Sequence, residues 1–329
     1  MANLESVITQ NYTDIKNSTL IELKAPESFK NISSEGLIVK NKFFYPALAA
    51  NAMPNIDNFL KLLNGSIRRF SLSAKELKEH REYTLQGDDI KAEEINSRGR
   101  KRFVKYAAEA AKRAGEIGEL TLFIILEAYL EAPKIASKMR LKTSDSMHVH
   151  GSDALHATLG ENDILTVILG ESKFHKQASN ARKDAIESIR GCISDYLKLG
   201  KEIEIIEANI DQELLDEELR NRILEYFGTF NPKNNYVKKS FAILLGYDRK
   251  SLYKGLSDIP DINERKVELE KRYLEHAESS VQDFFELLKL EDESYFKQVE
   301  FVYILLPFPD IRIIKEQFYK IAGLEKPEE

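Results

Sequence analysis

The sequence has no tryptophan and only one cysteine, Cys192, in 329 residues. A single cysteine excludes an internal disulfide and any zinc finger that needs paired thiolates, so a reducing cytoplasm is the expected compartment. We interpret Cys192 as a core residue. No stretch approaches about 18 uninterrupted apolar residues, and the residues after Met1 lack the basic start and apolar run of a signal peptide. The sequence therefore predicts a protein that is neither secreted nor bound to a membrane.

Positive charge is also in short supply, because 48 lysine and arginine residues stand against 54 aspartate and glutamate residues, for a formal net charge of -6. This balance is the opposite of a polybasic nucleic-acid binder, so any contact with nucleic acid must be local. There is no internal repeat, no Walker A pattern and no Rossmann glycine fingerprint, so we do not expect the chain to hydrolyse ATP. The apolar content of 43% allows a large core, in one elaborated domain or two.

The character of the chain changes along its length. We interpret residues 1–96 as an N-terminal accessory region of mixed strands and helices, and residues 97–329 as the main domain. A helical insertion is expected at about 201–230. One long helix is predicted over 97–130, with Pro133 marking its end.

Three short strands are predicted next, separated by polar turns. The third, ILTVILG, is almost wholly apolar and β-branched, as in a central strand covered on both faces. An amphipathic helix follows, and the segment EIEIIEANI after it fits either a strand or a helix. The order indicates an α/β (α+β) fold, a central mixed sheet flanked by helices. From the first strand to the closing helix, the predicted elements span 138–142, 147–155, 164–173, 176–200, 241–248, 263–288, 300–308 and 311–322.

The residues that suggest chemistry lie where the third strand ends. Alternation along a strand puts Glu171 and Lys173 on the same face, where both can act on one phosphate. Asp153 lies on the preceding strand among apolar residues, where a bound cation would remove the cost of burying its charge. Two carboxylates offer hard oxygen ligands for Mg²⁺, and the lysine ammonium can orient or deprotonate an attacking water. The pattern predicts metal-dependent hydrolysis of a phosphodiester.

A further carboxylate is expected from the helix before the strands. Glu119 is the first choice, with Glu116 and Glu127 as alternatives. A Glu-x-Lys pair alone carries little weight, because similar pairs begin at Glu22 and Glu76. A solvated strand end is the competing interpretation, but the buried strand and the aspartate before it favour a site.

Basic residues gather near these acids. Four of them occur with no acid between them: Lys134, Lys138, Arg140 and Lys142. We interpret this cluster as a phosphate contact for DNA, while the basic residues of the preceding helix are interpreted as a solvated face. Lys176 and Gln177, which open the next helix, are weaker candidates for contact with DNA.

Histidines leave a rival interpretation open. Four of the six fall in the same stretch: His148, His150, His156 and His175. Imidazoles suit Zn²⁺ or Mn²⁺, so a histidine-rich zinc hydrolase is conceivable, although HExxH and CxxC patterns are absent. We assign these histidines no catalytic role.

Four segments carry a resemblance to a known family: GEIGELTL (115–122), APKIASKMRLKTS (132–144), VHGSDALH (149–156) and LGESK (169–173). On them the chain resembles the nuclease subunit of the Hachiman anti-phage defence system, within the PD-(D/E)xK nuclease superfamily. The match is strongest from about 98 to 190. Ser152 stands where the superfamily pattern has a proline, a position that varies widely.

The resemblance implies a restriction-endonuclease-like core and a Mg²⁺-dependent DNase of the bacterial cytoplasm, with Mn²⁺ as an alternative ion. Its catalytic residues map to Asp153, Glu171 and Lys173, with Glu119 as the helix glutamate, and the three acids are the expected metal ligands. It also implies a superfamily 2 helicase, encoded nearby, that restrains the nuclease until phage-related DNA is sensed. We expect little sequence specificity, since no separate reading module is apparent. An alternative is a non-catalytic module that keeps this fold and binds DNA or the helicase.

Overall fold

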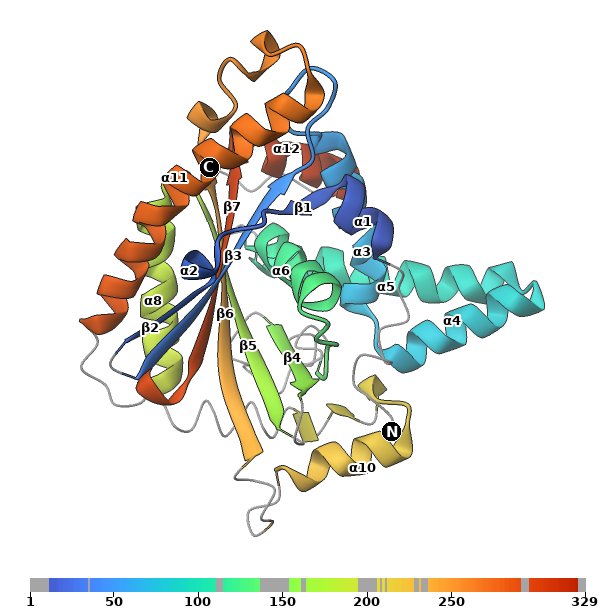
Figure 1. Ribbon diagram of the computed structural model, residues 1–329. Helices are drawn as coiled ribbons and strands as arrows, with labels where there is room; N and C mark the ends of the chain where they lie inside the picture. Colours follow the sequence, from blue (N-terminus) through green and yellow to red (C-terminus); the bar gives the residue numbers. More distant parts are fainter. Residues whose placement is uncertain are drawn as a thin grey trace.

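The fold is built around one mixed sheet of seven strands (Figure 1). It was obtained as a computed structural model and is described here for residues 12–324, except 35, 111–114, 137–153, 161–163, 195–205, 208, 211, 228–230, 232–235 and 291–295. The strands are β1 (Leu20–Glu22), β2 (Asn31–Ser34), β3 (Leu37–Pro46), β4 (Ala154–Leu159), β5 (Leu165–His175), β6 (Val237–Asp248) and β7 (Glu300–Phe308).

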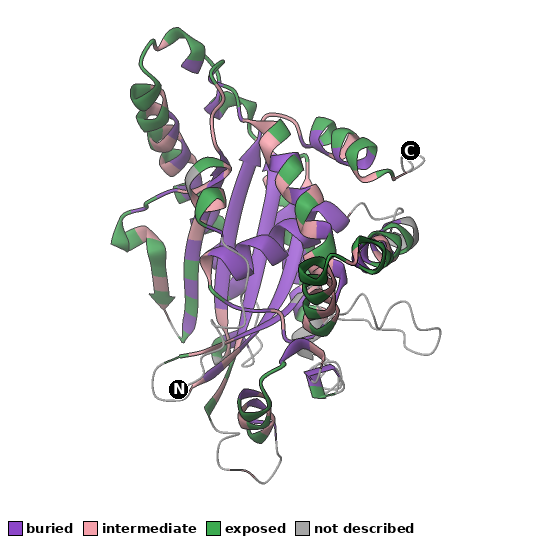
Figure 2. Cartoon of the chain, turned by 90° about the vertical axis from the view of Figure 1, so that its right-hand side faces the viewer, coloured by how far each residue is buried: buried purple, intermediate pink, exposed green. Residues whose placement is uncertain are grey.

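The strand order is β1-β3-β7-β6-β5-β4, and β2 also pairs with β3. β3, β7, β6 and β5 run parallel, whereas β1, β2 and β4 are antiparallel to their neighbours. The parallel strands are nearly continuous apolar runs such as FAILLGY in β6, because helices cover both of their faces. Figure 2 shows the strands of the sheet as largely buried.

The helices of the described residues are α1 (Thr13–Ser18), α2 (Glu27–Lys30), α3 (Ile56–Ser71), α4 (Ala74–Gln86), α5 (Asp89–Ala110), α6 (Glu116–Tyr129), α8 (Ala178–Ser194), α10 (Glu217–Glu225), α11 (Ile262–Lys289) and α12 (Ile311–Ala322), with 3-10 turns at Lys250–Leu252, Leu256–Asp258 and Phe296–Gln298. Side-chain caps fix several starts, since Ser73 and Glu76 form a capping box on α4 and Asp310 caps α12. Within the described part of the chain, none of the helices combines the length and apolar character needed to cross a bilayer.

Two hydrophobic cores lie on opposite faces of the sheet. α8 and α11 pack on one face, and α3, α5, α6 and α12 lie on the other (Figure 1). Successive strand residues alternate between these cores: Leu169 and Ile243 face α8, whereas Ile168 and Leu244 face α6. This alternation decides which helix each side chain of β5 can meet.

Most predicted elements are confirmed. The predicted strands at 164–173, 241–248 and 300–308 correspond to β5, β6 and β7, and the predicted helices at 263–288 and 311–322 correspond to α11 and α12. The mixed sheet flanked by helices is confirmed as well. The described residues of EIEIIEANI are helical, so its strand alternative is wrong there. The strand predicted at 138–142 and residues 147–153 of the next one lie outside the described residues.

The prediction of one long helix over 97–130 is wrong. The chain forms two helices instead, α5 and α6, and Gly115 is the N-cap of α6. Glycine has poor helix propensity, and the two segments differ in burial, since α6 is almost wholly buried and α5 has an exposed side. The break lets α6 enter the core while α5 stays at the surface.

The division of the chain at residue 96 stays a prediction. Its N-terminal part contributes β1, β2 and β3 to the same sheet as the rest of the chain, and β3 pairs in parallel with β7 from Ile38↔Glu300 to Phe43↔Leu305. The predicted helical insertion at 201–230 includes α10, whose Leu219 and Ile223 join the α8-side core.

Candidate functional site

Glu171 and Lys173 meet at the end of β5. Lys173 Nζ lies 2.7 Å from Glu171 Oε1, and their side chains are 24% and 12% exposed, respectively. β5 pairs with β6 in unbroken register from Leu165↔Val237 to His175↔Tyr247, so both side chains lie on the face that α8 covers. A largely buried carboxylate beside an ammonium group is therefore placed at the carboxyl end of a parallel strand.

The chain after β5 adds polar groups at the same end. Lys176 and Gln177 are both exposed, and the Gln177 carbonyl accepts a hydrogen bond from the Ala181 amide in the first turn of α8. The amino end of α8 thus follows directly on the strand that carries the ion pair. Helix amino ends favour anions, which suits the predicted contact of Lys176 and Gln177 with a phosphate.

Asp153 lies outside the described residues. β4 begins at the next residue, Ala154, which pairs with Gly170, the residue before Glu171. Among the described residues, no group of three or more histidine, cysteine, aspartate or glutamate side chains is arranged to hold a metal ion. The donor chemistry of Asp153 and Glu171, carboxylate oxygens, suits Mg²⁺ or Mn²⁺.

Glu119 comes from the opposite side of β5. α6 approaches β5 so closely that a Cβ on Gly118 would lie 2.8 Å from Ser172 Oγ, and Ser172 alternates with Glu171 and Lys173 along the strand. α6 therefore packs on the face that Glu171 and Lys173 do not share. The Tyr106 hydroxyl on α5 donates a hydrogen bond to Glu119 Oε2.

Three buried glutamates lie on α6, and each accepts a hydrogen bond from a tyrosine hydroxyl. Glu116, Glu119 and Glu127 are 0%, 9% and 3% exposed. Their donors come from three distant elements: Tyr319 on α12, Tyr106 on α5 and Tyr12 before α1. Buried carboxylates need such donors, because an unsolvated oxygen without one is costly. The sequence signal was three acids on an apolar helix, but no spacing revealed their partners.

The two ends of α6 differ in electrostatics. Glu127 also receives the Arg69 guanidinium, with Nε 2.5 Å and Nη2 3.2 Å from its two oxygens. Glu116 has Tyr319 on one oxygen, while its Oε2 is buried with no hydrogen-bond partner among the described residues. Burial raises the pKa of Glu116, and the hydrogen bond from Tyr319 and then the Lys315 ammonium oppose that rise only in part.

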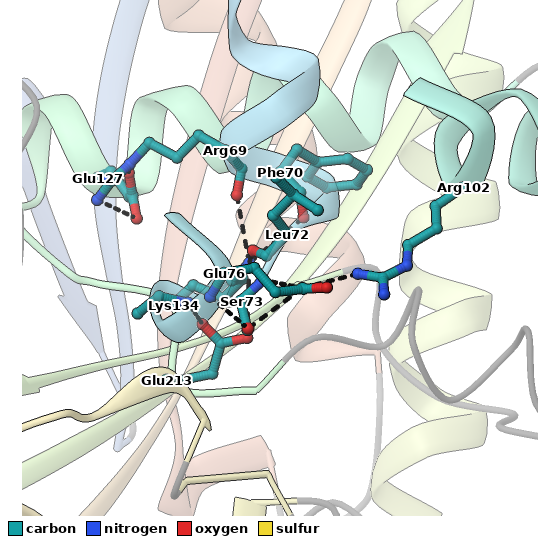
Figure 3. Close-up of polar contacts among 10 residues, drawn as sticks. Arg69, Phe70, Leu72, Ser73, Glu76, Arg102, Glu127, Lys134 and Glu213 are labelled. Atoms are coloured by element: carbon teal, nitrogen blue, oxygen red, sulfur yellow. Dashed lines mark hydrogen bonds and ion pairs between the residues drawn. The ribbon is translucent and has the colours of Figure 1, made fainter. Parts of the chain in front are cut away.

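The ammonium group of Lys134 forms hydrogen bonds within the protein (Figure 3). Its Nζ donates to the carbonyls of Arg69, Phe70 and Leu72 at 3.3, 3.3 and 2.8 Å, where α3 ends, and lies 3.7 Å from Glu213 Oε1. The side chain is only 10% exposed. A DNA contact by Lys134 would require these bonds to break. Lys138, Arg140 and Lys142 lie outside the described residues.

The basic face of α5 is partly neutralised. Arg98 and Arg102 both pair with Glu76 on α4, at 3.4 and 2.7 Å (Figure 3 shows the Arg102 contact). These pairs and the Ser73 capping box hold the pKa of Glu76 at about 2, against the opposing effect of burial. Such contacts agree with the interpretation of this helix face as structural and solvated.

The histidines that are described have protein partners. His156 is fully buried, its Nδ1 lies 2.7 Å from the Ala132 carbonyl oxygen, and burial lowers its pKa to about 4. His175 Nε2 lies 3.3 Å from Asp184 on α8. His148 and His150 lie outside the described residues. His156 is thus a neutral core residue at physiological pH.

Comparison with known proteins adds one finding to this geometry. The model of the HamA family matches residues 26–322, which is most of the 329-residue chain. A search of curated proteins finds no match.

Proposed function

The chain belongs to the HamA family, a component of the Hachiman anti-phage defence system, and from this premise we propose that it is the system's Mg²⁺-dependent DNA nuclease. The observation that carries the proposal is the Glu171–Lys173 pair at the carboxyl end of β5, 2.7 Å apart and largely buried. An acid and an amine held this way suit phosphodiester hydrolysis, in which the carboxylate can bind a cation and the lysine can orient the attacking water.

The order of elements supports a restriction-endonuclease-like core. From α6 the chain passes through β4 and β5, which are antiparallel, then through α8 to β6, which is parallel to β5. A continuation of the β4–β5 register by one residue would pair Asp153 with Glu171, and directly paired residues share a face. In this proposal Asp153 completes the acid pair of the site.

Each residue has a distinct role in the proposed reaction. Glu171 and Asp153 would hold the Mg²⁺, which supplies charge stabilisation at the phosphate when it is bound. Lys173, held as an ammonium by its 2.7 Å contact with Glu171, would orient the attacking water and offset the negative charge that develops at the phosphate, while the proton of that water would pass to bulk water. Lys176, Gln177 and the amino end of α8 orient the scissile phosphate. We assign little sequence specificity, because these groups contact phosphates and not base edges.

Regulation follows from the system to which the family belongs. Family membership places this chain in a Hachiman system together with HamB. We propose that HamB is the helicase that restrains the nuclease, since an unrestrained nuclease would cut its own host's DNA. Cleavage is therefore expected in the complex, after a DNA substrate has engaged HamB.

A plasmid-cleavage assay on the complex with HamB, in Mg²⁺ and in EDTA, tests the proposal. We expect Glu171→Gln and Lys173→Gln each to slow cleavage by about 100-fold or more, because each removes a group that acts on the reacting atoms. The matched control is Glu300→Gln with Lys40→Gln, which removes a 2.9 Å ion pair between β3 and β7 of the same sheet. The control should cleave like wild type. Equal cleavage by the Glu171 and Lys173 variants would refute the nuclease assignment.

A further inference from the structure

A groove between α3 and α4 collects positive charge. Its volume is about 460 Å³. The two helices lie on the side of the molecule opposite to α8 and α11 (Figure 1). Among the described residues that line it, four are cationic and none is acidic: Lys61, Arg68, Arg69 and Arg81. Arg69 is turned inward to Glu127, which offsets its charge.

The charges in the groove repel one another. Burial and then the neighbouring Arg81 lower the pKa of Arg68. The Arg68 guanidinium lies 3.1 Å from His80 Nε2, which must be the unprotonated acceptor there. Burial and then Arg68 lower the pKa of His80, which outweighs the opposing charge of Glu93. Arg68 therefore donates a hydrogen bond to a neutral ring and not to an acid. A bound anion would reduce the repulsion between the cationic side chains of the groove.

Four aliphatic side chains form part of the wall of the groove. Ile15, Leu62, Leu77 and Leu85 line it beside the cations, and Leu85 is 81% exposed. Cationic side chains can bind a phosphate, and the aliphatic side chains beside them can contact a flat apolar group. A nucleotide combines the two. A bare inorganic anion would leave these walls unused.

Gly65 keeps the groove open. It lies in the interior of α3, where glycine weakens a helix, and a Cβ at this position would meet nothing within 4 Å. Packing within the protein therefore does not require glycine here. A longer side chain at position 65 would project into the space that the groove provides.

We propose that the α3–α4 groove is a second anion site that binds a nucleotide unit, either free or within a DNA strand, with its phosphate on Arg68, Arg81 and Lys61. This site goes beyond the proposed nuclease activity and does not use Glu171. Binding here can be measured without cleavage, so the two proposals fail separately.

The test uses the full chain in EDTA, with a fluorescently labelled 12-nucleotide single-stranded DNA as the probe and unlabelled dAMP, ATP and inorganic phosphate as competitors. We expect Arg68→Gln to weaken binding of the oligonucleotide by about tenfold, the loss of one charge-assisted contact. Gly65→Glu should weaken it at least as much, because it adds an acid and fills the groove. The matched controls are Gly65→Ala, which adds only a methyl group, and Lys75→Gln, which removes an exposed α4 charge outside the groove.

The competitors identify the source of the ligand. Displacement by dAMP or ATP at micromolar concentration supports a free nucleotide, and displacement only by unlabelled oligonucleotide supports a strand. Displacement by inorganic phosphate as readily as by dAMP would refute the nucleotide assignment. Binding that is unchanged in both Arg68→Gln and Gly65→Glu, with Gly65→Ala and Lys75→Gln as references, would overturn the site. Thermal melting of every variant separates a lost contact from a lost fold.

Discussion

Glutamates lie on both sides of β5, but their surroundings differ. On the α8 face, Glu171 is held against Lys173 at the end of the strand, with part of both side chains exposed. On the α6 face, Ser172 lies under Gly118, and the glutamates of α6 are held by tyrosine hydroxyls within the core. A buried acid alone is therefore no sign of catalysis, because its partner and its access to solvent decide what it can do.

This difference between the two faces of β5 predicts which substitutions affect cleavage and which affect stability. If the comparison is right, changes on the α8 face alter cleavage and leave stability nearly intact. Changes on the α6 face lower stability and leave the cleavage rate of the folded protein nearly intact. The variants below challenge the second half of this statement.

The largest effect is expected from Arg69→Met. The change leaves the carboxylate of Glu127, which is 3% exposed, without the guanidinium 2.5 Å away. Removing one partner of a buried ion pair typically costs about 3–5 kcal/mol. Urea unfolding of the variant should show a loss of that order, and Arg69→Met with Glu127→Gln should recover a large part of it. A loss below about 1 kcal/mol would mean that the pair is no more important than a surface contact.

An intermediate effect is expected from Tyr106→Phe. The change removes the hydroxyl that donates to Glu119 Oε2, at a typical cost of about 1–3 kcal/mol. Cleavage by the complex with HamB should stay within about tenfold of wild type, since Glu119 lies across β5 from Lys173. A loss as large as that of Glu171→Gln, in a variant that still melts as a folded protein, would support the prediction that Glu119 belongs to the catalytic site.

The smallest effect concerns Glu116 and pH. Burial raises the pKa of Glu116 in the folded protein above its ordinary value of 4.5, so the folded state binds the proton more tightly than the unfolded state. The resulting contribution to stability is complete below pH 4.5 and falls as pH rises through the raised pKa. Glu116→Gln should therefore flatten the decline in unfolding free energy above pH 4.5, measured by urea titration. An identical pH profile in the variant would show that protonation of Glu116 does not contribute to stability.

Long apolar strands and strongly periodic helices could be predicted from the sequence. β5, β6 and β7 stood out because burial on both faces demands unbroken apolar runs, and α11 and α12 because their apolar residues recur at helical spacing. The parallel pairing of β3 with β7 could not be predicted, since it joins Ile38 to Glu300 across most of the chain. The break before α6 was missed because α5 and α6 are both rich in helix formers.

Only the part of the candidate site that depends on local spacing could be predicted. Strand alternation brought Glu171 and Lys173 to one face from local spacing alone, and the structure has them in contact. Choosing a third acid required knowledge of which face α6 covers, which no local pattern contains. The groove between α3 and α4 was missed because Arg68 and Arg81 meet only after the turn between the helices reverses the chain.

Lys134 has a mechanical consequence for the strand next to the site. Its ammonium is fastened to the last carbonyls of α3, and its backbone forms a bridge with His156 on β4. β4 in turn holds Gly170 through Ala154. The end of α3 is therefore linked to the residue that precedes Glu171 through one side chain and two strand pairings, so a displacement of that helix end would strain the hydrogen bonds at the edge of the sheet.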